Sequence, residues 1–258
     1  MAEAGLARYV YCVVPAGAAV EVEGLAGVAP GRAVETIRHA DLGAVTSWVS
    51  LAEFGAEPLR RNLNDLDWLA RAARAHEAVL ERALATGPIA PLRLCTVFAG
   101  DDEVRAMLER EHDTLADALA RLRDREEWGV KLIADPGRVR AAEAEPQPTS
   151  GRSYLERRGR ERREQEEFRH LITQAAEEIH ARLSERATAA TLLRPQSREL
   201  SGRHGDMVLN GAYLVDRSRV EEFRAAAAEA AERRRELGLA LEVTGPWPPY
   251  NFVGSEAT

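Results

Sequence analysis

Residues 206–244 read DMVLNGAYLVDRSRVEEFRAAAAEAAERRRELGLALEVT and decide the fold of the second half of the chain. The first part, 206–216, is rich in aliphatic and β-branched residues and predicts a strand. Residues 218–237 consist mainly of Ala, Glu and Arg, which favour a helix, and 239–244 again predicts a strand. This stretch therefore contains a strand, a helix and a strand in succession.

The residues before this stretch extend the pattern to six elements. WGVKLIAD (128–135) predicts a strand, 153–187 a long helix and AATLLR (189–194) another strand. The order strand, helix, strand, strand, helix, strand is that of the ferredoxin-like fold. We therefore expect an α+β protein with two domains, the C-terminal one a modified ferredoxin-like βαββαβ unit with a long extended helix.

The N-terminal half has a mixed set of elements of its own, so we place the domains at 1–126 and 127–258 of the 258 residues. Residues 136–150, rich in Pro, Ala and charged residues, predict a mobile connection inside the second domain. The elements predicted for the first domain are strands at 8–14, 32–38, 42–50 and 88–100 and helices at 62–86 and 101–122.

The predicted helix 62–86 is amphipathic, and Asn62 or Asn64 can cap its start. His76 does not belong to its apolar stripe, so we expect this side chain on the helix surface or at the domain boundary. Cys95, in the strand predicted next, is expected to be a small buried apolar side chain. The residues of the helix stripe recur at three- and four-residue steps: Leu66, Leu69, Ala73, Leu80 and Leu84.

The composition excludes several classes of protein. A net charge of −7 argues against a nucleic-acid binder, which needs basic charge to meet phosphates. No stretch of 18 apolar residues is present to span a membrane, and two distant cysteines do not form a disulfide framework. We therefore expect a cytoplasmic protein.

Motifs for common catalytic, nucleotide and metal sites are absent from the sequence. There is no GxxxxGK[ST] loop, and the His76-Glu77 pair has Leu80 where a zinc-protease helix needs its second histidine. Neither Cys12 nor Cys95 has a basic sequence environment that would activate a thiol. The sequence predicts no catalytic residue, no metal site and no cofactor.

The C-terminal GPWPPYNF (245–252) has the composition of a contact segment. Three prolines favour an extended path, and Trp247, Tyr250 and Phe252 are residues that contribute strongly to interfaces. The alternative is that the segment folds back and covers the core of its own domain.

The start of the long helix offers a second candidate surface. LERRGRERREQEE (155–167) has almost no apolar face, and we single out Arg157, Arg158 and Arg162 as candidate contacts with a protein partner. The alternative is a solvated helix held by Glu–Arg pairs.

Seven motifs lie in order over roughly residues 8–253: RYVYCVV (8–14), HEAVLERAL (76–84), GPIAPLRLCTVF (87–98), EWGVKL (127–132), SGRSYLERR (150–158), LNGAYLVD (209–216) and GPWPPYNF (245–252). Together they resemble the gas vesicle protein F/L family (GvpF/GvpL). One departure is Arg93-Leu94-Cys95-Thr96, where members often have Arg-Phe-Gly-Thr.

The resemblance implies a non-enzymatic accessory protein of the gas vesicle, a cytoplasmic, gas-filled compartment with a protein wall that gives buoyancy. It implies binding to the major shell protein, contacts with other accessory proteins and help in nucleating or assembling the wall. It also implies two α+β domains, the second ferredoxin-like. The F or L subtype and the oligomeric state stay open.

Two other functions compete with this one. A ferredoxin-like enzyme or small-ligand binder needs polar residues on core-facing strand positions, and 189–194 and 206–216 offer mainly aliphatic ones. An RNA-binding domain with the same element order needs exposed aromatics and a basic face, which Tyr213 alone does not supply. A protein-binding role is therefore favoured.

Overall fold

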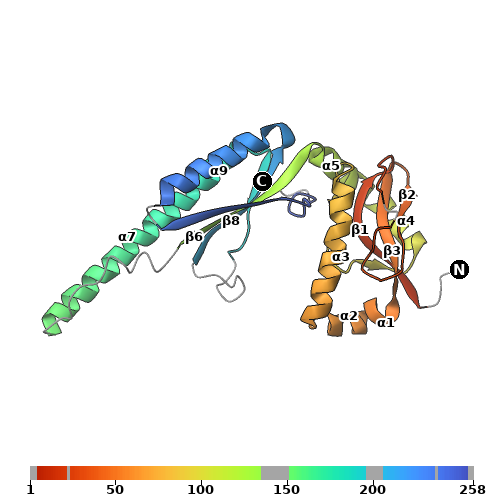
Figure 1. Cartoon of the computed structure of the whole chain (residues 1–258), viewed down its shortest axis with the longest axis horizontal. Coiled ribbons are helices and arrows are strands. Elements are labelled where there is room, and N and C mark those ends of the chain that lie inside the picture. Colours follow the sequence, from red (N-terminus) through yellow and green to blue (C-terminus); the bar gives the residue numbers. More distant parts are fainter. Residues whose placement is uncertain (1–4, 22–23, 135–150, 196–205, 236–237, 255–258) are drawn as a thin grey trace. The chain divides into compact units, whose positions relative to one another are not determined.

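A computed structural model describes residues 5–21, 24–134, 151–195, 206–235 and 238–254 (Figure 1). The described parts of Met1–Glu126 and Pro248–Ala257 form one compact unit, and those of Glu127–Trp247 form another. The sequence-based division places 248–258 in the second domain, but residues 248–254 belong to the first unit. The connection expected at 136–150 lies outside the described residues.

The first unit is built on a sheet with strand order β2-β3-β1-β4, in which β5 also pairs with β1. The central strand β1 pairs antiparallel with β3, β4 and β5. The strands are β1 (Leu6–Pro15), β2 (Val34–His39), β3 (Leu42–Ser50), β4 (Ala90–Pro91) and β5 (Val97–Phe98).

Helices cover both faces of this sheet, which explains why β1 is buried along almost its whole length. Tyr9 and Val45 pack in a core with residues of α3, and Val10 and Ala44 pack in a second core with residues of α4 and α5. The helices are α1 (Leu51–Phe54), α2 (Ala56–Asn62), α3 (Leu66–Leu84), α4 (Asp101–Arg110) and α5 (His112–Leu122).

Two elements predicted as continuous are interrupted. The predicted strand 88–100 forms only β4 and β5, because the backbone turns between Arg93 and Thr96 and Cys95 adopts a left-handed φ of 66°. The predicted helix 101–122 is divided at Glu111 into α4 and α5. The side chain of Cys95 is only partly buried.

The buried face of α3 agrees only in part with the predicted one: Leu80 is buried, and Leu69 and Leu84 pack partly buried against the core. The helix begins later, because the Asp65 carboxylate accepts the backbone N–H groups of Asp67 and Trp68 and caps it. Leu66 is 78% exposed, whereas the burial of Trp68 removes a larger apolar area from water. The residues that α3 buries are Trp68, Ala72, His76, Val79, Leu80 and Ala83.

The second unit contains one sheet with strand order β7-β8-β6-β9. In it β6 pairs antiparallel with β9, and β7 pairs antiparallel with β8. Helices α7 and α9 contribute to one core with residues of the sheet and cover one of its faces (Figure 1). The elements are β6 (Arg125–Ala134), α7 (Gly151–Ser184), β7 (Ala189–Leu192), β8 (Asp206–Asp216), the 3-10 helix η1 (Arg217–Arg219), α9 (Val220–Arg234) and β9 (Leu239–Trp247).

The structure is thus a mixed α/β fold with two sheets. The six elements predicted between 128 and 244 are present in the predicted order, with shifted bounds. Helix α7 has 34 residues, and its N-terminal half extends past α9 and the sheet in Figure 1. Its inner half packs through Ile172, Ala175 and Ile179, while Leu171 is 49% exposed.

Candidate binding surfaces

The three aromatic residues of the C-terminal segment lie in different surroundings. Trp247 ends β9 in the second unit, is 47% exposed, and donates its indole N–H to Thr244 Oγ1 at 3.1 Å. Tyr250 and Phe252 belong to the first unit. Phe252 is 2% exposed, so it is a buried residue and not an accessible contact as the sequence suggested. The structure does not gather the three side chains on one exposed surface.

His76 connects the C-terminal segment to the core of the first unit. Its side chain is 1% exposed, which corrects the surface position expected from the sequence. Its Nδ1 lies 2.9 Å from Tyr9 Oη, and its Nε2 lies 3.1 Å from Tyr250 Oη. The Tyr250 hydroxyl donates to Glu77 Oε1 at 3.1 Å, so its oxygen is left to accept from His76. We call Tyr9, His76, Glu77 and Tyr250 the His76 cluster.

Burial shifts the pKa values of the His76 cluster toward the uncharged forms. It lowers the pKa of His76 to about 4 and raises the pKa of Tyr9 and of Glu77. The pKa of Tyr250 is raised by burial and by the neighbouring Glu77 carboxylate. A neutral imidazole accepts one hydrogen bond and donates another, which suits a position between two hydroxyls. The geometry fits a clamp that holds the C-terminal segment.

The Arg-rich half of α7 is exposed wherever its side chains are described. Arg158 is exposed, and the Nε of Arg162 lies 3.2 Å from Glu166 Oε1 in an exposed i,i+4 ion pair. The side chain of Arg157 lies outside the described residues. Arg162 therefore has the environment of the solvated-helix alternative, and a partner contact there stays a prediction.

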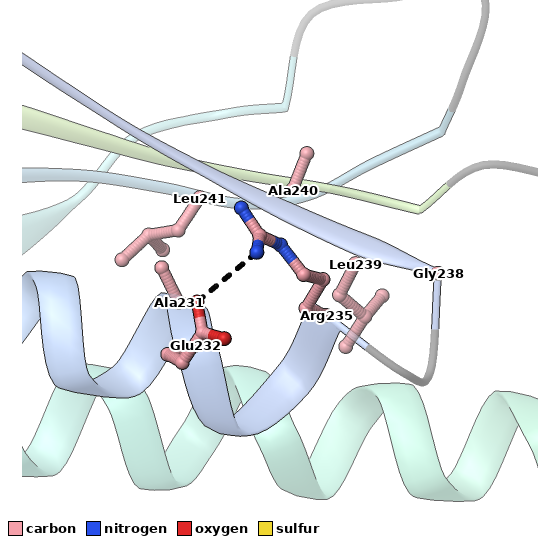
Figure 2. A pocket seen from close by; sticks show the side chains of 7 residues that line it. All are labelled: Ala231, Glu232, Arg235, Gly238, Leu239, Ala240 and Leu241. Atoms are coloured by element: carbon pink, nitrogen blue, oxygen red, sulfur yellow. Dashed lines mark ion pairs between the residues drawn. The ribbon is translucent and has the colours of Figure 1, made fainter.

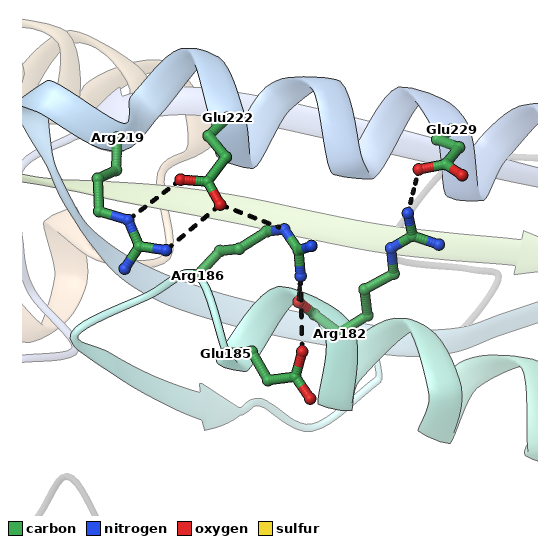
Figure 3. Close-up of polar contacts among 6 residues, drawn as sticks. All are labelled: Arg182, Glu185, Arg186, Arg219, Glu222 and Glu229. Atoms are coloured by element: carbon green, nitrogen blue, oxygen red, sulfur yellow. Dashed lines mark hydrogen bonds and ion pairs between the residues drawn. The ribbon is translucent and has the colours of Figure 1, made fainter.

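The inner half of α7 directs its charges toward α9. Arg182 pairs with Glu229 of α9 (Figure 3), and Arg234 of α9 pairs with Glu178. Arg186 lies near the end of α7, and its Nε is 3.8 Å from Glu222 Oε1. In these three pairs the residue numbers increase along α7 from 178 to 186, whereas those of the α9 partners decrease from 234 to 222. The two helices are therefore antiparallel. These charges line the contact between the two helices, which also share an apolar core.

A polar pocket of about 400 Å³ lies at the end of α9 (Figure 2). Its charged groups pair with each other, since Arg235 Nη1 lies 3.5 Å from Glu232 Oε2. The other lining residues are small or aliphatic, so the pocket offers little chemistry beyond this pair. They are Ala231, Gly238, Leu239, Ala240 and Leu241.

A more apolar groove of about 610 Å³ lies between α7 and the strand β7. We call it the β7 groove. Leu192 lines it from β7 and is 58% exposed. His180 lines it from α7 and bonds through Nδ1 to the buried Tyr213 hydroxyl at 2.9 Å. The other lining residues are Ile172, Thr173, Ala176, Glu177, Leu193, Arg194, Pro195, Val208, Leu209 and Asn210.

The described residues contain neither a metal-binding cluster nor a membrane-spanning helix. Within the described ranges, no group of three His, Cys, Asp or Glu side chains is placed to hold a metal ion. No helix among them combines the length and apolarity needed to cross a membrane. Burial raises the pKa of both Cys12 and Cys95, so neither thiol is activated as a nucleophile.

The sequence did not reveal the His76 cluster or the β7 groove. If the apolar stripe of this helix is drawn through Trp68, His76 falls on the buried face, because it follows Trp68 by eight residues, or about two helical turns. A buried histidine needs hydrogen-bond partners, and the tyrosines of the motifs at 8–14 and 245–252 are suitable ones. The groove had no such signal, because it depends on how α7 crosses the sheet.

Comparison with known proteins gives a consistent result. Residues 7–254 match the family described as "Gas vesicle synthesis protein GvpL/GvpF". The chain is 44% identical to gas vesicle protein L of a Streptomyces species, over 96% of this chain and 92% of that protein. It is 27% identical to gas vesicle protein F of the same species, over 96% of this chain and all of that protein.

A solved structure shows the same fold. The crystal structure of gas vesicle protein GvpF from an Anabaena species has a TM-score of 0.71 to this chain at 18% identity, covering 97% of each chain. The sequence matches confirm the resemblance that the seven motifs indicated. The chain therefore belongs to the gas vesicle protein GvpL/GvpF family.

Proposed function

We propose that this protein is an accessory component of gas vesicle formation that binds the major shell protein and helps to nucleate or assemble the vesicle wall. Membership of the GvpL/GvpF family implies a role in gas vesicle formation. The observation that carries the proposal is the 44% identity to a gas vesicle protein L over nearly the whole chain. The protein would then act in the cytoplasm, at the vesicle.

A physical argument supports the binding step. A shell subunit must be apolar on its gas-facing side, and such a surface aggregates in water before assembly. A partner with an exposed aromatic side chain and an apolar groove can cover part of that surface. This chain offers Trp247, which is half exposed, and the β7 groove. Its net charge of −7 helps to keep a complex in solution.

We infer that the second unit is a modified ferredoxin-like domain and that the two units are separate domains. The element order β6, α7, β7, β8, α9, β9 and the strand order β7-β8-β6-β9 support the first inference. Separate hydrophobic cores in the two units support the second. The extended α7 is the main departure from a compact ferredoxin-like unit.

The proposal assigns no enzymatic activity, and none of the named relatives has an enzyme's name. It assigns no cofactor. Other gas vesicle accessory proteins are proposed as further partners, with the exposed half of α7 as a surface for them.

Co-expression with the major shell protein tests the proposal. The full-length chain carries an affinity tag, and the shell protein is measured in the soluble eluate and in the pellet. A tagged unrelated acidic protein of similar size is the control. We expect a complex of defined stoichiometry that keeps shell protein in the soluble fraction. Recovery no better than the control, with a folded chain, would refute direct binding.

A further inference from the structure

Within the ranges that the structure describes, β7 is an edge strand of its sheet. It is the last strand in the order β7-β8-β6-β9 and pairs there with β8 alone. Leu193 donates its backbone N–H to Asn210 O at 2.7 Å, so the backbone N–H and C=O of Leu193 point toward β8. Because hydrogen bonding alternates along an antiparallel pair, the backbone N–H and C=O of Ala190 and Leu192 point away from β8.

This edge has little protection against pairing with another strand. Natural edge strands are commonly blocked by Lys, by Pro or by a charge that faces inward. Residues 188–193, TAATLL, contain no charge and no proline, and Arg194-Pro195 follows only after the strand. Such a stretch has the composition of a segment that accepts a further strand.

The β7 groove lies beside this edge, on the face of the sheet that α7 covers. Leu192 pairs with Gly211 and Ala190 with Tyr213, so both side chains face the same way as the buried Tyr213 ring. Ala190 packs against the core, but Leu192 stays 58% exposed in the groove. Ile172 and Ala176 of α7 form the opposite wall.

The chemistry of the two features specifies the occupant. Outward-facing backbone donors and acceptors are satisfied by another main chain, and an apolar groove beside them accepts the alternate side chains of that chain. We propose that an extended apolar segment of the shell subunit adds to the sheet at β7 and places alternate side chains in the β7 groove. This inference rests on the proposed function, because it names the site at which that binding occurs.

Two substitutions at one position test the two parts of the interaction. Leu192→Lys keeps the outward N–H and puts a charge at the mouth of the groove. Leu192→Pro removes the outward N–H together with the leucine side chain, and a proline on an edge strand is able to lose this N–H without breaking the pairing with β8. Leu66→Lys is the matched control, because Leu66 is 78% exposed and lies on α3 of the first unit.

The experiment is the co-expression assay with the full-length chain and these three variants. We expect Leu192→Lys and Leu192→Pro to reduce the soluble shell protein recovered by about tenfold, which corresponds to about 1.4 kcal/mol of binding free energy. Leu66→Lys should recover as much as the wild type. Circular dichroism melting of each variant reports whether the fold is kept. In the wild-type complex, the amides of Ala190 and Leu192 should exchange more slowly than in the free chain.

The outcomes separate the site from the function. Full recovery by both Leu192 variants, with the wild type also binding, overturns the β7 site and leaves the proposed function in place. No recovery by the wild type refutes the function, and the site falls with it. A loss of self-association in the Leu192 variants without a loss of shell protein would show that a second copy occupies the edge, which also overturns the proposal.

Discussion

The Tyr250 hydroxyl lies 3.1 Å from the Nε2 atom of His76, which precedes it by 174 residues. Tyr250 follows the second unit in the sequence, but this contact joins it to the first unit. The chain crosses from one unit to the other after Glu126 and again after Trp247. Glu127 of β6 pairs with Trp247 of β9. The chain therefore enters and leaves the second unit at two neighbouring strands. Residues 248–252 of this chain therefore belong structurally to the first unit, where Tyr250 is bonded to His76.

Replacing Tyr250 with Phe should destabilise the protein. The change removes the hydroxyl that joins His76 to Glu77 and leaves two buried or partly buried polar groups without this partner. We expect a loss of about 1 kcal/mol in the free energy of unfolding, at the lower end for such groups because Tyr250 is partly exposed. Urea unfolding of the full chain measures it. Trp247→Phe is the control, and an equal effect of both changes would argue against the clamp.

The stability of the first unit should depend on pH through His76. Its folded pKa of about 4 lies below the ordinary value near 6.5, so the unfolded chain binds more protons between these values. The contribution of neutral His76 to the free energy of unfolding is fully present above about pH 6.5 and is lost as the pH falls from there through about 4. The difference of about 2.5 pKa units sets an upper bound of about 3 kcal/mol.

A His76→Gln variant isolates this contribution from the other titrating groups. Glutamine keeps hydrogen-bonding capacity but does not titrate, and the carboxylates, Glu77 included, are common to both proteins. The wild type should lose more stability than the variant as the pH falls from about 7 to about 4. Parallel pH profiles for the two proteins would show that His76 does not titrate as described.

The ion pair between Arg182 and Glu229 should contribute little by itself. Both side chains are partly exposed, at 31% and 45%, so solvent screens their attraction. A double-mutant cycle with Arg182→Ala and Glu229→Ala should give a coupling of about 0.5 kcal/mol that falls in high salt. A coupling of several kcal/mol that salt leaves unchanged would contradict this account of the α7–α9 contact.

Trp247 should matter more for binding than for folding. Its ring is 47% exposed, and its indole N–H bonds only the nearby Thr244 among the described residues. We expect Trp247→Ala to change the free energy of unfolding by less than about 1 kcal/mol while lowering recovery of shell protein. Trp128→Ala is the contrasting variant, because this ring is 7% exposed in the core and its loss should cost about 3 kcal/mol or more. Unchanged shell protein recovery by Trp247→Ala would remove Trp247 as a contact.

Much of the fold could be predicted because local patterns and tertiary structure agree. The β-branched and aliphatic residues predicted as a strand form β8, and the Ala-rich stretch predicted as a helix forms α9. The pattern fails where tertiary contacts compete with local preference. The strand expected at 88–100 is broken by a left-handed residue at Cys95, whose backbone N–H donates to the buried Tyr9 hydroxyl.

The candidate surfaces were harder to predict. The aromatic residues at 245–252 were identified from composition, but composition does not tell an exposed Trp247 from a buried Phe252. The position of His76 depended on which face of α3 is buried, and that face carries both Trp68 and His76. The β7 groove arises from the packing of α7 against the sheet, which no local pattern encodes.

Turbidity of the purified shell protein on dilution from denaturant tests the proposed direct binding without other vesicle proteins. Adding the folded chain should suppress aggregation in proportion to its amount and leave a soluble complex of both proteins on sedimentation. An equal amount of the unrelated acidic protein should have no effect. Aggregation unchanged by the folded chain, with no complex on sedimentation, would contradict the account.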